Sequence, residues 1–205
     1  MIDGFKCDRY SLYFNGYPIT DTPKRSYLDA EIDTVPLAGA QEGVNTLAIY
    51  MTVSGKNAGL LDMLKITGTF TVRQDKQGLY IDRPSQTLVY GDWCEQGYPF
   101  LSAMVDYTRQ VSIPEDFLGQ QLILSADVGD DLFEVFIDDQ KVGTRMWQPY
   151  ELDLTPYITR SDFRLTVRVV NPIANLLEGK RKPSGLRSCR ITPLPRYTFQ
   201  TLEAQ

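Results

Sequence analysis

The ionisable side chains decide which chemistry this chain can carry out. It contains 26 acidic and 21 basic residues but no histidine. Ser–His and Cys–His nucleophilic systems and imidazole metal sites are therefore excluded, because each of them requires a histidine. A glycosidase needs two carboxylates held beside the scissile bond, and Asp92, Glu95, Glu134 and Glu151 are the available acids. Nothing in their spacing brings two of them together, so we expect no catalytic residue in this chain.

Patterns for metal binding are weak. The three cysteines Cys7, Cys94 and Cys189 are far apart and odd in number, which favours free buried thiols over a disulfide framework or a zinc site. The acidic cluster Asp127–Asp131 offers the oxygen ligands that calcium prefers, but it lacks the ligand spacing of an EF-hand loop. We favour a solvated acidic hairpin over structural calcium, and we expect no metal and no cofactor.

The composition is that of a globular protein, with 42% hydrophobic and 23% charged residues. A net charge of −5 argues against a nucleic-acid surface, and the basic run Lys180–Lys182 is too short to alter that interpretation. No apolar run approaches the roughly 20 residues that span a bilayer. We therefore expect neither nucleic acid nor membrane as a partner, and the sequence does not indicate a cellular location.

The elements that could position functional side chains are short strands, which the sequence indicates by alternating apolar and polar residues. Val105, Tyr107, Val111 and Ile113 share one face of an extended segment, with Arg109 as the polar exception. The segments Ile66–Val72 and Phe163–Val169 alternate in the same way, which predicts strands with one wet face. No segment keeps a period of 3.6 over a dozen residues. Strands at intervals of roughly 8–12 residues predict an all-β sandwich or jelly roll.

Between these strands, two segments have other patterns. Leu60–Lys65 is compatible with one helical turn. Asp75–Gln86 is polar and contains Gly78 and Pro84, so we expect a long loop or a linker there.

Two stretches of the chain resemble each other at an offset of roughly 120 residues. Tyr10–Asn15 leads through a tight turn to Tyr27, and Phe133–Asp138 leads through a tight turn to Trp147. The later copy has additional strands before it. We therefore predict a complete jelly roll over residues 88–195, preceded by extra strands from a second, partial unit in residues 1–80 and followed by a tail over 196–205. The alternative is that both parts share one sheet system.

The later copy also resembles a known family. The motifs are Gly97-Tyr98-Pro99-Phe100, Phe133–Asp138, Trp147-Gln148-Pro149-Tyr150, Leu152-Asp153-Leu154 and Asn171 through Leu177. Over roughly residues 88–190 they resemble the galactose-binding-like jelly rolls of large bacterial glycoside hydrolases, of the family-2 type or rhamnosidase-like. Asp138-Asp139 replaces the usual Asn-Gly of the second hairpin, and Ser161–Arg164 replaces a common Gly-x-Asn. The resemblance implies a non-catalytic domain that binds carbohydrate or supports a catalytic domain.

Sugars are bound by aromatic platforms and by planar polar groups that reach their hydroxyls. We predict Trp93, Tyr98, Trp147 and Tyr150 as carbohydrate-binding residues. Phe100 is a further aromatic candidate, with Asp92, Glu95, Gln96 and Arg145 as polar neighbours. Each aromatic also has a structural interpretation: Trp147 as a core or sheet-edge residue, Trp93 as a packed loop residue, and Tyr98–Phe100 as the start of a strand that packs over the sheet.

The sequence thus predicts a carbohydrate-binding or accessory domain of a bacterial glycoside hydrolase, with carbohydrate and the catalytic domain of a parent enzyme as partners. This chain alone is not expected to be an enzyme. The alternative is a structural β-sandwich that braces a catalytic domain without binding sugar.

Overall fold

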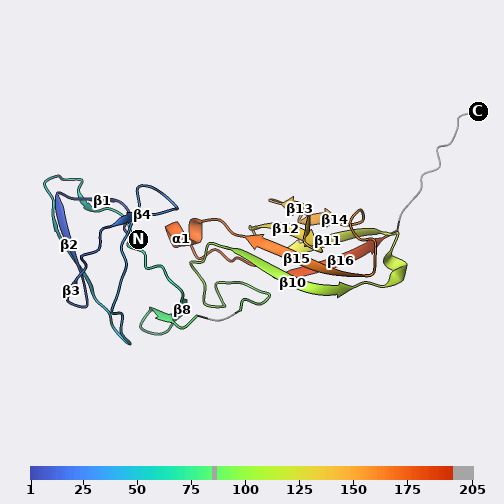
Figure 1. The fold of residues 1–205 in the computed structure, drawn as a ribbon, viewed down its shortest axis with the longest axis horizontal. Coiled ribbons are helices and arrows are strands. Elements are labelled where there is room, and N and C mark those ends of the chain that lie inside the picture. Colours follow the sequence, from blue (N-terminus) through green and yellow to red (C-terminus); the bar gives the residue numbers. More distant parts are fainter. Residues whose placement is uncertain (85–86, 196–205) are drawn as a thin grey trace, which may run out of the picture. The chain divides into compact units, whose positions relative to one another are not determined.

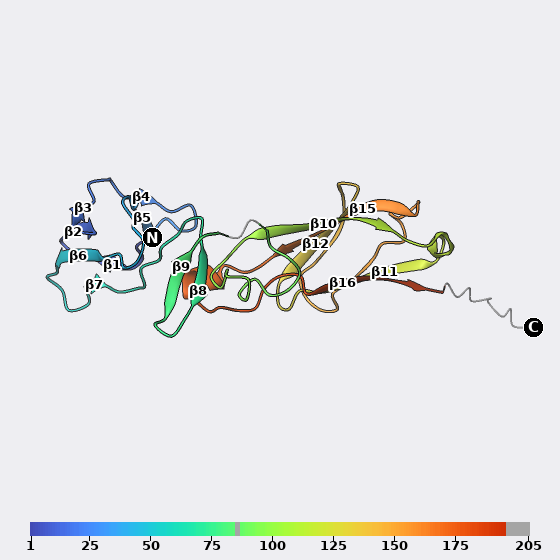
Figure 2. The same ribbon diagram turned by 90° about the horizontal axis from the view of Figure 1, so that it is seen from below.

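The computed structural model describes residues 1–84 and 87–195, and the predicted tail over 196–205 lies outside them. The chain divides into two compact units, Met1–Thr69 and Phe70–Gln205. Most of the polar stretch expected to be a loop or linker is instead a hairpin of the second unit. Its strands are β8 (Thr71–Gln74) and β9 (Leu79–Asp82), which pair antiparallel (Figure 2).

Besides the β8–β9 hairpin, the second unit contains a sandwich of two antiparallel sheets, which confirms the predicted all-β class (Figure 1). The first sheet has the order β10-β15-β12-β13, with β10 (Met104–Ser112), β15 (Asp162–Val170), β12 (Leu132–Ile137) and β13 (Gln140–Arg145). The second sheet has the order β14-β11-β16, with β14 (Glu151–Asp153), β11 (Gln121–Asp127) and β16 (Ser188–Leu194). In the part of this unit that the structure describes, the helical segments are the short η1 (Glu115–Phe117) and α1 (Ala174–Glu178).

Alternation of side chains builds the core between the two sheets. Strand β15 buries Phe163, Leu165, Val167 and Val169 and leaves Arg164 exposed. Leu122 and Leu124 of β11 meet this layer from the second sheet. Full burial of each such side chain stabilises the fold by about 1.5–3 kcal/mol relative to exposure. The expected inward set of β10 is confirmed, because Val105, Tyr107 and Val111 pack against the same core.

The first unit contains shorter strands in three small sheets. Its main sheet has the order β3-β2-β6, with β2 (Arg9–Phe14), β3 (Tyr17–Pro18) and β6 (Leu47–Thr52) (Figure 2). The two smaller sheets pair β1 (Phe5–Lys6) with β7 (Gly59–Leu60), and β4 (Lys24–Arg25) with β5 (Asp33–Thr34). Leu12, Phe14 and Ile32 are buried in this unit.

Two local predictions are wrong. The strand expected over Ile66–Val72 begins only at Thr71, because no strand pairs with residues 66–70 and Ile66 is exposed. The helical turn expected over Leu60–Lys65 does not form, since Leu60 belongs to β7 and the N-terminal ammonium of Met1 donates to the carbonyl of Lys65 at 2.7 Å. In the first segment a pairing partner is missing, and in the second the pairing of β7 with β1 replaces the helical turn.

Candidate functional site

Trp93 lies in the interior of the second unit, with 0% of its surface exposed. Its indole N–H donates to the hydroxyl of Tyr107 at 2.7 Å, and its backbone N–H donates to the carbonyl of Ser184 at 2.8 Å. A Cβ atom on Gly185 would lie 2.6 Å from the indole nitrogen, so the ring is tightly enclosed. The prediction of Trp93 as a sugar platform is therefore wrong, because this ring is a core residue whose polar atom is satisfied internally.

The loop around Trp93 is likewise tied to the protein. Asp92 accepts backbone hydrogen bonds from Cys94 at 2.9 Å and from Ser184 at 3.1 Å, and the side chain of Gln96 accepts one from Val89 at 2.8 Å. Tyr98 is half-buried against the core cluster, which agrees with its structural interpretation. These planar polar groups hold the loop closed. They do not line an open site with the two aromatic rings.

The acidic cluster Asp127–Asp131 is divided between the surface and the interior. Asp127 is exposed and lies 3.6 Å from Arg187, whereas Asp131 is buried and accepts from the backbone N–H of Gly185 at 2.9 Å. Burial raises the pKa of the Asp131 carboxyl to about 6. In residues 1–84 and 87–195, no three His, Cys, Asp or Glu side chains are grouped so that they could hold a metal ion.

The cysteines follow the same pattern of partial burial. All three are free, as the spacing predicted, but each is only partly buried, whereas buried thiols were expected. Burial is the main cause that raises the pKa of Cys94 and of Cys189 to about 11. Both thiols are thus held in their protonated, weakly nucleophilic form at neutral pH.

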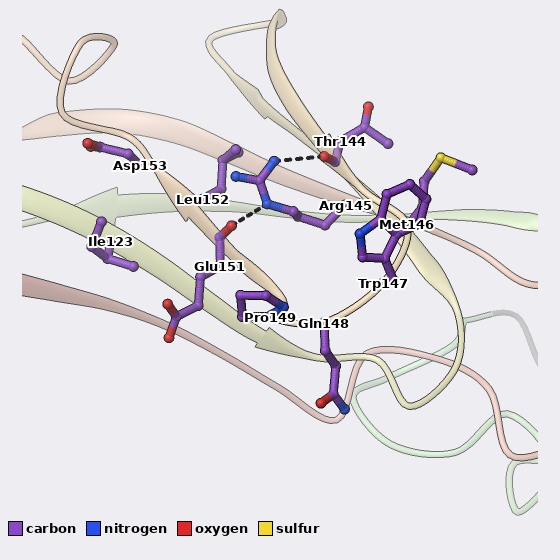
Figure 3. Close-up of a pocket in the computed structure, with 10 residues that line it drawn as sticks. All are labelled: Ile123, Thr144, Arg145, Met146, Trp147, Gln148, Pro149, Glu151, Leu152 and Asp153. Atoms are coloured by element: carbon purple, nitrogen blue, oxygen red, sulfur yellow. Dashed lines mark hydrogen bonds between the residues drawn. The ribbon is translucent and has the colours of Figure 1, made fainter.

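Trp147 is placed very differently from Trp93, with 72% of its surface exposed. It lies where the chain leaves β13 of one sheet and enters β14 of the other (Figure 3). Arg145 holds this crossing segment in place, because its guanidinium donates to the carbonyls of Thr144 (3.0 Å) and of Glu151. The core interpretation of Trp147 is therefore wrong: the side chain stands outside the sandwich, beside the exposed Met146 (Figure 3).

A depression of about 560 Å³ opens beside Trp147. Trp147 and Met146 lie at one end of it, Asp153 lies at the other, and Arg145 lies between them (Figure 3). Ile123 of β11 also lines it, which supplies apolar surface. The depression thus combines an exposed indole with charged and apolar side chains.

Two further depressions continue this one along the outer face of β11. One shares Asp153 with it and adds Gln121, and the other shares Gln148, Pro149 and Glu151 and adds Ser125 and Asp127. Since Leu122 and Leu124 point inward, the outward residues of β11 follow one another along all three. We call the three depressions together the β11 groove.

Tyr150 lines the β11 groove at the end near Asp127. Its ring is half-buried, and its centroid lies 5.9 Å from that of Phe133 in the core. Partial burial, followed by the charges of Asp130 and Asp131, raises the pKa of Tyr150. The structure therefore brings two of the four predicted aromatics, Trp147 and Tyr150, to one groove, and it separates Trp93 and Tyr98 from that groove.

The polar residues of the groove are acidic in excess. Asp127, Asp130, Glu151 and Asp153 line it together with the two cations Arg145 and Arg187. Asp153 accepts hydrogen bonds from Gln121 at 3.2 Å and from the backbone of Thr155 at 2.9 Å. The sequence analysis did not propose Gln121, Ile123, Asp153 or Gln148 as binding residues. Gln121 and Ile123 of β11 and Asp153 of β14 come together because β11 pairs with β14, and Gln148 lies in the segment that leads into β14, which no local pattern reveals.

The acids considered for catalysis are not gathered at this groove. Glu134 lies on the outer face of the first sheet, where Lys141 and Arg168 pair with it, whereas Glu151 lies on the outer face of the second sheet. Asp92 is bound to backbone N–H groups in the Trp93 loop. The groove itself presents aromatic, amide and charged groups.

No protein-family model and no curated protein matches the chain. Similar solved structures include a β-glucuronidase from Bifidobacterium dentium, at 25% identity over 45% of this chain and a TM-score of 0.38. A rhamnosidase from Novosphingobium sp. matches at 18% identity over 85% of this chain with a TM-score of 0.35. A glycosyl hydrolase family 2 member from Bacteroides cellulosilyticus matches at 16% identity over 62% of this chain with a TM-score of 0.38. This chain spans 16%, 17% and 19% of the length of those three chains. Among the described residues, none forms a helix long and apolar enough to cross a bilayer.

Proposed function

We propose that the second unit binds a glycan chain in the β11 groove, with Trp147 as the aromatic platform. The observation that carries the proposal is the 72% exposure of this indole beside a depression of about 560 Å³. A tryptophan in this crossing segment is held out of the core although the sandwich has a large apolar interior. Such an exposed ring suits the apolar face of a pyranose.

The rest of the groove supports a glycan over a purely apolar ligand. Gln121, Ser125 and Gln148 supply neutral polar groups, and Asp153 and Glu151 supply carboxylate acceptors for hydroxyl groups. The seven residues of β11 give the groove a length of about 20 Å, at about 3.4 Å per residue. A length of this order accommodates several linked sugar rings and exceeds what one monosaccharide needs.

The proposed role of the chain is that of an accessory module. The sequence resemblance of residues 88–190 to the jelly rolls of bacterial glycoside hydrolases supplies the context: binding here would hold substrate near a catalytic domain. The chain has no histidine, and its candidate acids are dispersed, so the proposal assigns it no turnover.

Isothermal titration with neutral oligosaccharides tests this proposal. The probes are xylohexaose, mannohexaose and a β-1,4-galactan hexasaccharide, and we expect saturable binding of at least one of them. Removal of the platform in Trp147→Ala should weaken it at least tenfold, because a stacked ring contributes about 1 kcal/mol beyond the area it buries. Tyr27→Ala is the matched control, since Tyr27 is a 93% exposed aromatic residue of the first unit and is not among the residues that line the β11 groove. A flat response to all three probes, or equal binding by Trp147→Ala, would reject the proposal.

One observation favours a second candidate, the bracing of another protein domain. Met146 and Trp147 are adjacent and both largely exposed, and an exposed aromatic next to a methionine is also typical of protein interfaces. The bracing function would be supported if the protein bound none of the glycan probes but bound a catalytic domain, and if Trp147→Ala abolished that binding.

A further inference from the structure

The main sheet of the first unit repeats the hairpin and the following strand of the second unit. In sheet order, β3-β2-β6 corresponds to β13-β12-β15. Both hairpins turn at a residue with positive φ, Asn15 at 51° and Asp138 at 47°. Each turn residue also fixes the neighbouring strand through two bonds. Asn15 N–H donates to the Thr46 carbonyl and its Oδ1 accepts from Thr46 N–H, both at 2.8 Å, and Asp138 makes the same pair of bonds to Arg164 at 2.9 Å.

This correspondence places the two strands in the same register. Thr46 is equivalent to Arg164, so Leu47, Ile49 and Met51 of β6 are equivalent to Leu165, Val167 and Val169 of β15. Residues in an antiparallel pair alternate between those that bond to one neighbour and those that bond to the other. The backbone groups of Ala48 and Tyr50 therefore face β2, and those of Leu47, Ile49 and Met51 face the far edge of β6.

In the second unit, the equivalent edge is occupied by β10. Val105, Tyr107 and Arg109 of β10 lie directly opposite Val169, Val167 and Leu165. In the first unit, β6 is the last strand of its sheet within residues 1–84 and 87–195. Strand β15 is thus paired with β10 along this edge, whereas the equivalent edge of β6 carries no strand in the described residues.

Strand β6 carries none of the features that protect an edge strand from pairing. Its sequence, Leu-Ala-Ile-Tyr-Met-Thr, contains no charge, no proline and no glycine, and it pairs with β2 without a bulge. Natural edge strands are usually blocked by charges, prolines or bulges, because the unpaired N–H and C=O groups otherwise accept another strand. An unprotected edge of six residues favours a pairing function.

We propose that the far edge of β6 binds an extended segment of another polypeptide by adding it as an antiparallel strand. The pairing of β10 with β15 defines the geometry, with the incoming residues opposite Leu47, Ile49 and Met51. The charge pattern defines the chemistry of the partner. Asp106 of β10 pairs with Arg168, at 2.7 Å, but the equivalent of Arg168 in β6 is Tyr50, whose ring meets Tyr13 edge-to-face at 5.5 Å. The incoming strand is therefore one that places alternating apolar side chains opposite Leu47, Ile49 and Met51 and that needs no acidic residue opposite Tyr50.

Hydrogen–deuterium exchange of the full chain, followed by NMR, tests the proposal with a defined probe. The probe is an acetylated peptide with the sequence Met104–Ile113, which covers β10 and the residue that follows it. We expect it to slow the exchange of the Leu47, Ile49 and Met51 amides at least tenfold and to leave Ala48 and Tyr50, already bonded to β2, unchanged. The control peptide carries Tyr107→Pro, which removes the central N–H donor, and it should give no protection.

Two substitutions of opposite charge at Tyr50 test the register in which the peptide pairs with β6. Tyr50→Glu places a carboxylate opposite Asp106 of the peptide and should weaken its binding about twofold to fivefold, whereas Tyr50→Lys should not. Both variants must keep the β2 amides protected, which shows that the sheet is folded. The proposal is overturned if the three amides exchange equally with and without the peptide, or if the proline peptide protects them as well. Protection that rises with protein concentration alone would also overturn it, since a second copy would then be the occupant.

Discussion

At the scale of single residues, the two tryptophans show that local sequence context does not determine burial. Trp93 follows a glycine and an aspartate, yet it is sealed beneath Ser184 and Gly185 and donates to Tyr107. Trp147 ends a stretch of sheet residues, yet it stands in solvent because the chain is crossing between sheets. Only partners more than ten residues away distinguish the two, so their sequence neighbours could not.

Asp131 is the residue whose environment predicts a pH dependence of stability. Its folded pKa of about 6 lies above the usual 3.8, because burial disfavours the carboxylate. The folded state therefore binds the proton more tightly than the unfolded state, and the stabilisation by protonation is fully present below about pH 4 and is lost as the pH rises through 6. Over that window, this group lowers the free energy of unfolding by up to about 3 kcal/mol.

Asp131→Asn isolates this effect, since its amide can still accept from Gly185 and donate to Ser184. We expect the free energy of unfolding in urea, wild type minus variant, to fall between pH 4 and pH 7. Asp82, Asp106 and Asp138, whose pKa values are lowered, give the opposite slope, but they are common to both proteins and cancel in the difference. A difference that stays constant from pH 4 to pH 7 would show that the Asp131 pKa is not raised.

At the scale of elements, alternation predicted strands wherever one face is buried by a partner. The segments expected around Val105–Ile113 and Phe163–Val169 became β10 and β15 with bounds within one residue. The alternation of Ile66–Val72 is as regular, but only its end is a strand, because pairing is a property of two segments and not of one. The repeated hairpins were visible in the sequence because positive φ demands Asn, Asp or Gly.

Asn15 makes the role of these turn residues testable. Its side chain accepts from Thr46 N–H at 2.8 Å and donates to Asn45 and Gly39 while its backbone holds a φ of 51°. Asn15→Ala should lower the free energy of unfolding by about 2 kcal/mol, combining the positive-φ penalty with the lost hydrogen bonds. Asn15→Asp keeps the acceptor and tolerates the turn, so it should lose less than half as much. Urea unfolding measures the difference, and a faster exchange of the Thr46 amide in the alanine variant locates it; equal losses would show that the acceptor contributes nothing.

At the scale of the whole molecule, the sequence predicted the all-β class, which the structure confirms, whereas the β11 groove became visible only from the strand order. Composition and alternation determine that a core forms, whereas the groove depends on β14 pairing with β11 and on the crossing segment that bears Trp147. Two of the four predicted aromatics therefore lie on the groove for reasons the sequence did not contain. The net charge of −5 was visible from the start, and the structure adds that acidic residues also predominate in the groove.

That distribution of charge predicts which glycans the β11 groove rejects. Asp127, Asp130, Glu151 and Asp153 outnumber Arg145 and Arg187, and the molecule as a whole is anionic, so a chain of uronic acids meets like charge at both short and long range. We expect hexagalacturonate to bind at least tenfold more weakly than the best neutral hexasaccharide at 20 mM salt. The difference in affinity between the two hexasaccharides should become smaller at 500 mM salt, where exposed charges are screened. The double substitution Glu151→Gln with Asp153→Asn should narrow it at low salt as well, whereas Glu115→Gln, an exposed acid in η1, should leave it unchanged. Titration calorimetry measures the affinities of the wild type and of both variants for the two hexasaccharides at each salt concentration. Tighter binding of hexagalacturonate than of every neutral probe would mean that Arg145 and Arg187, and not the carboxylates, set the specificity of the groove.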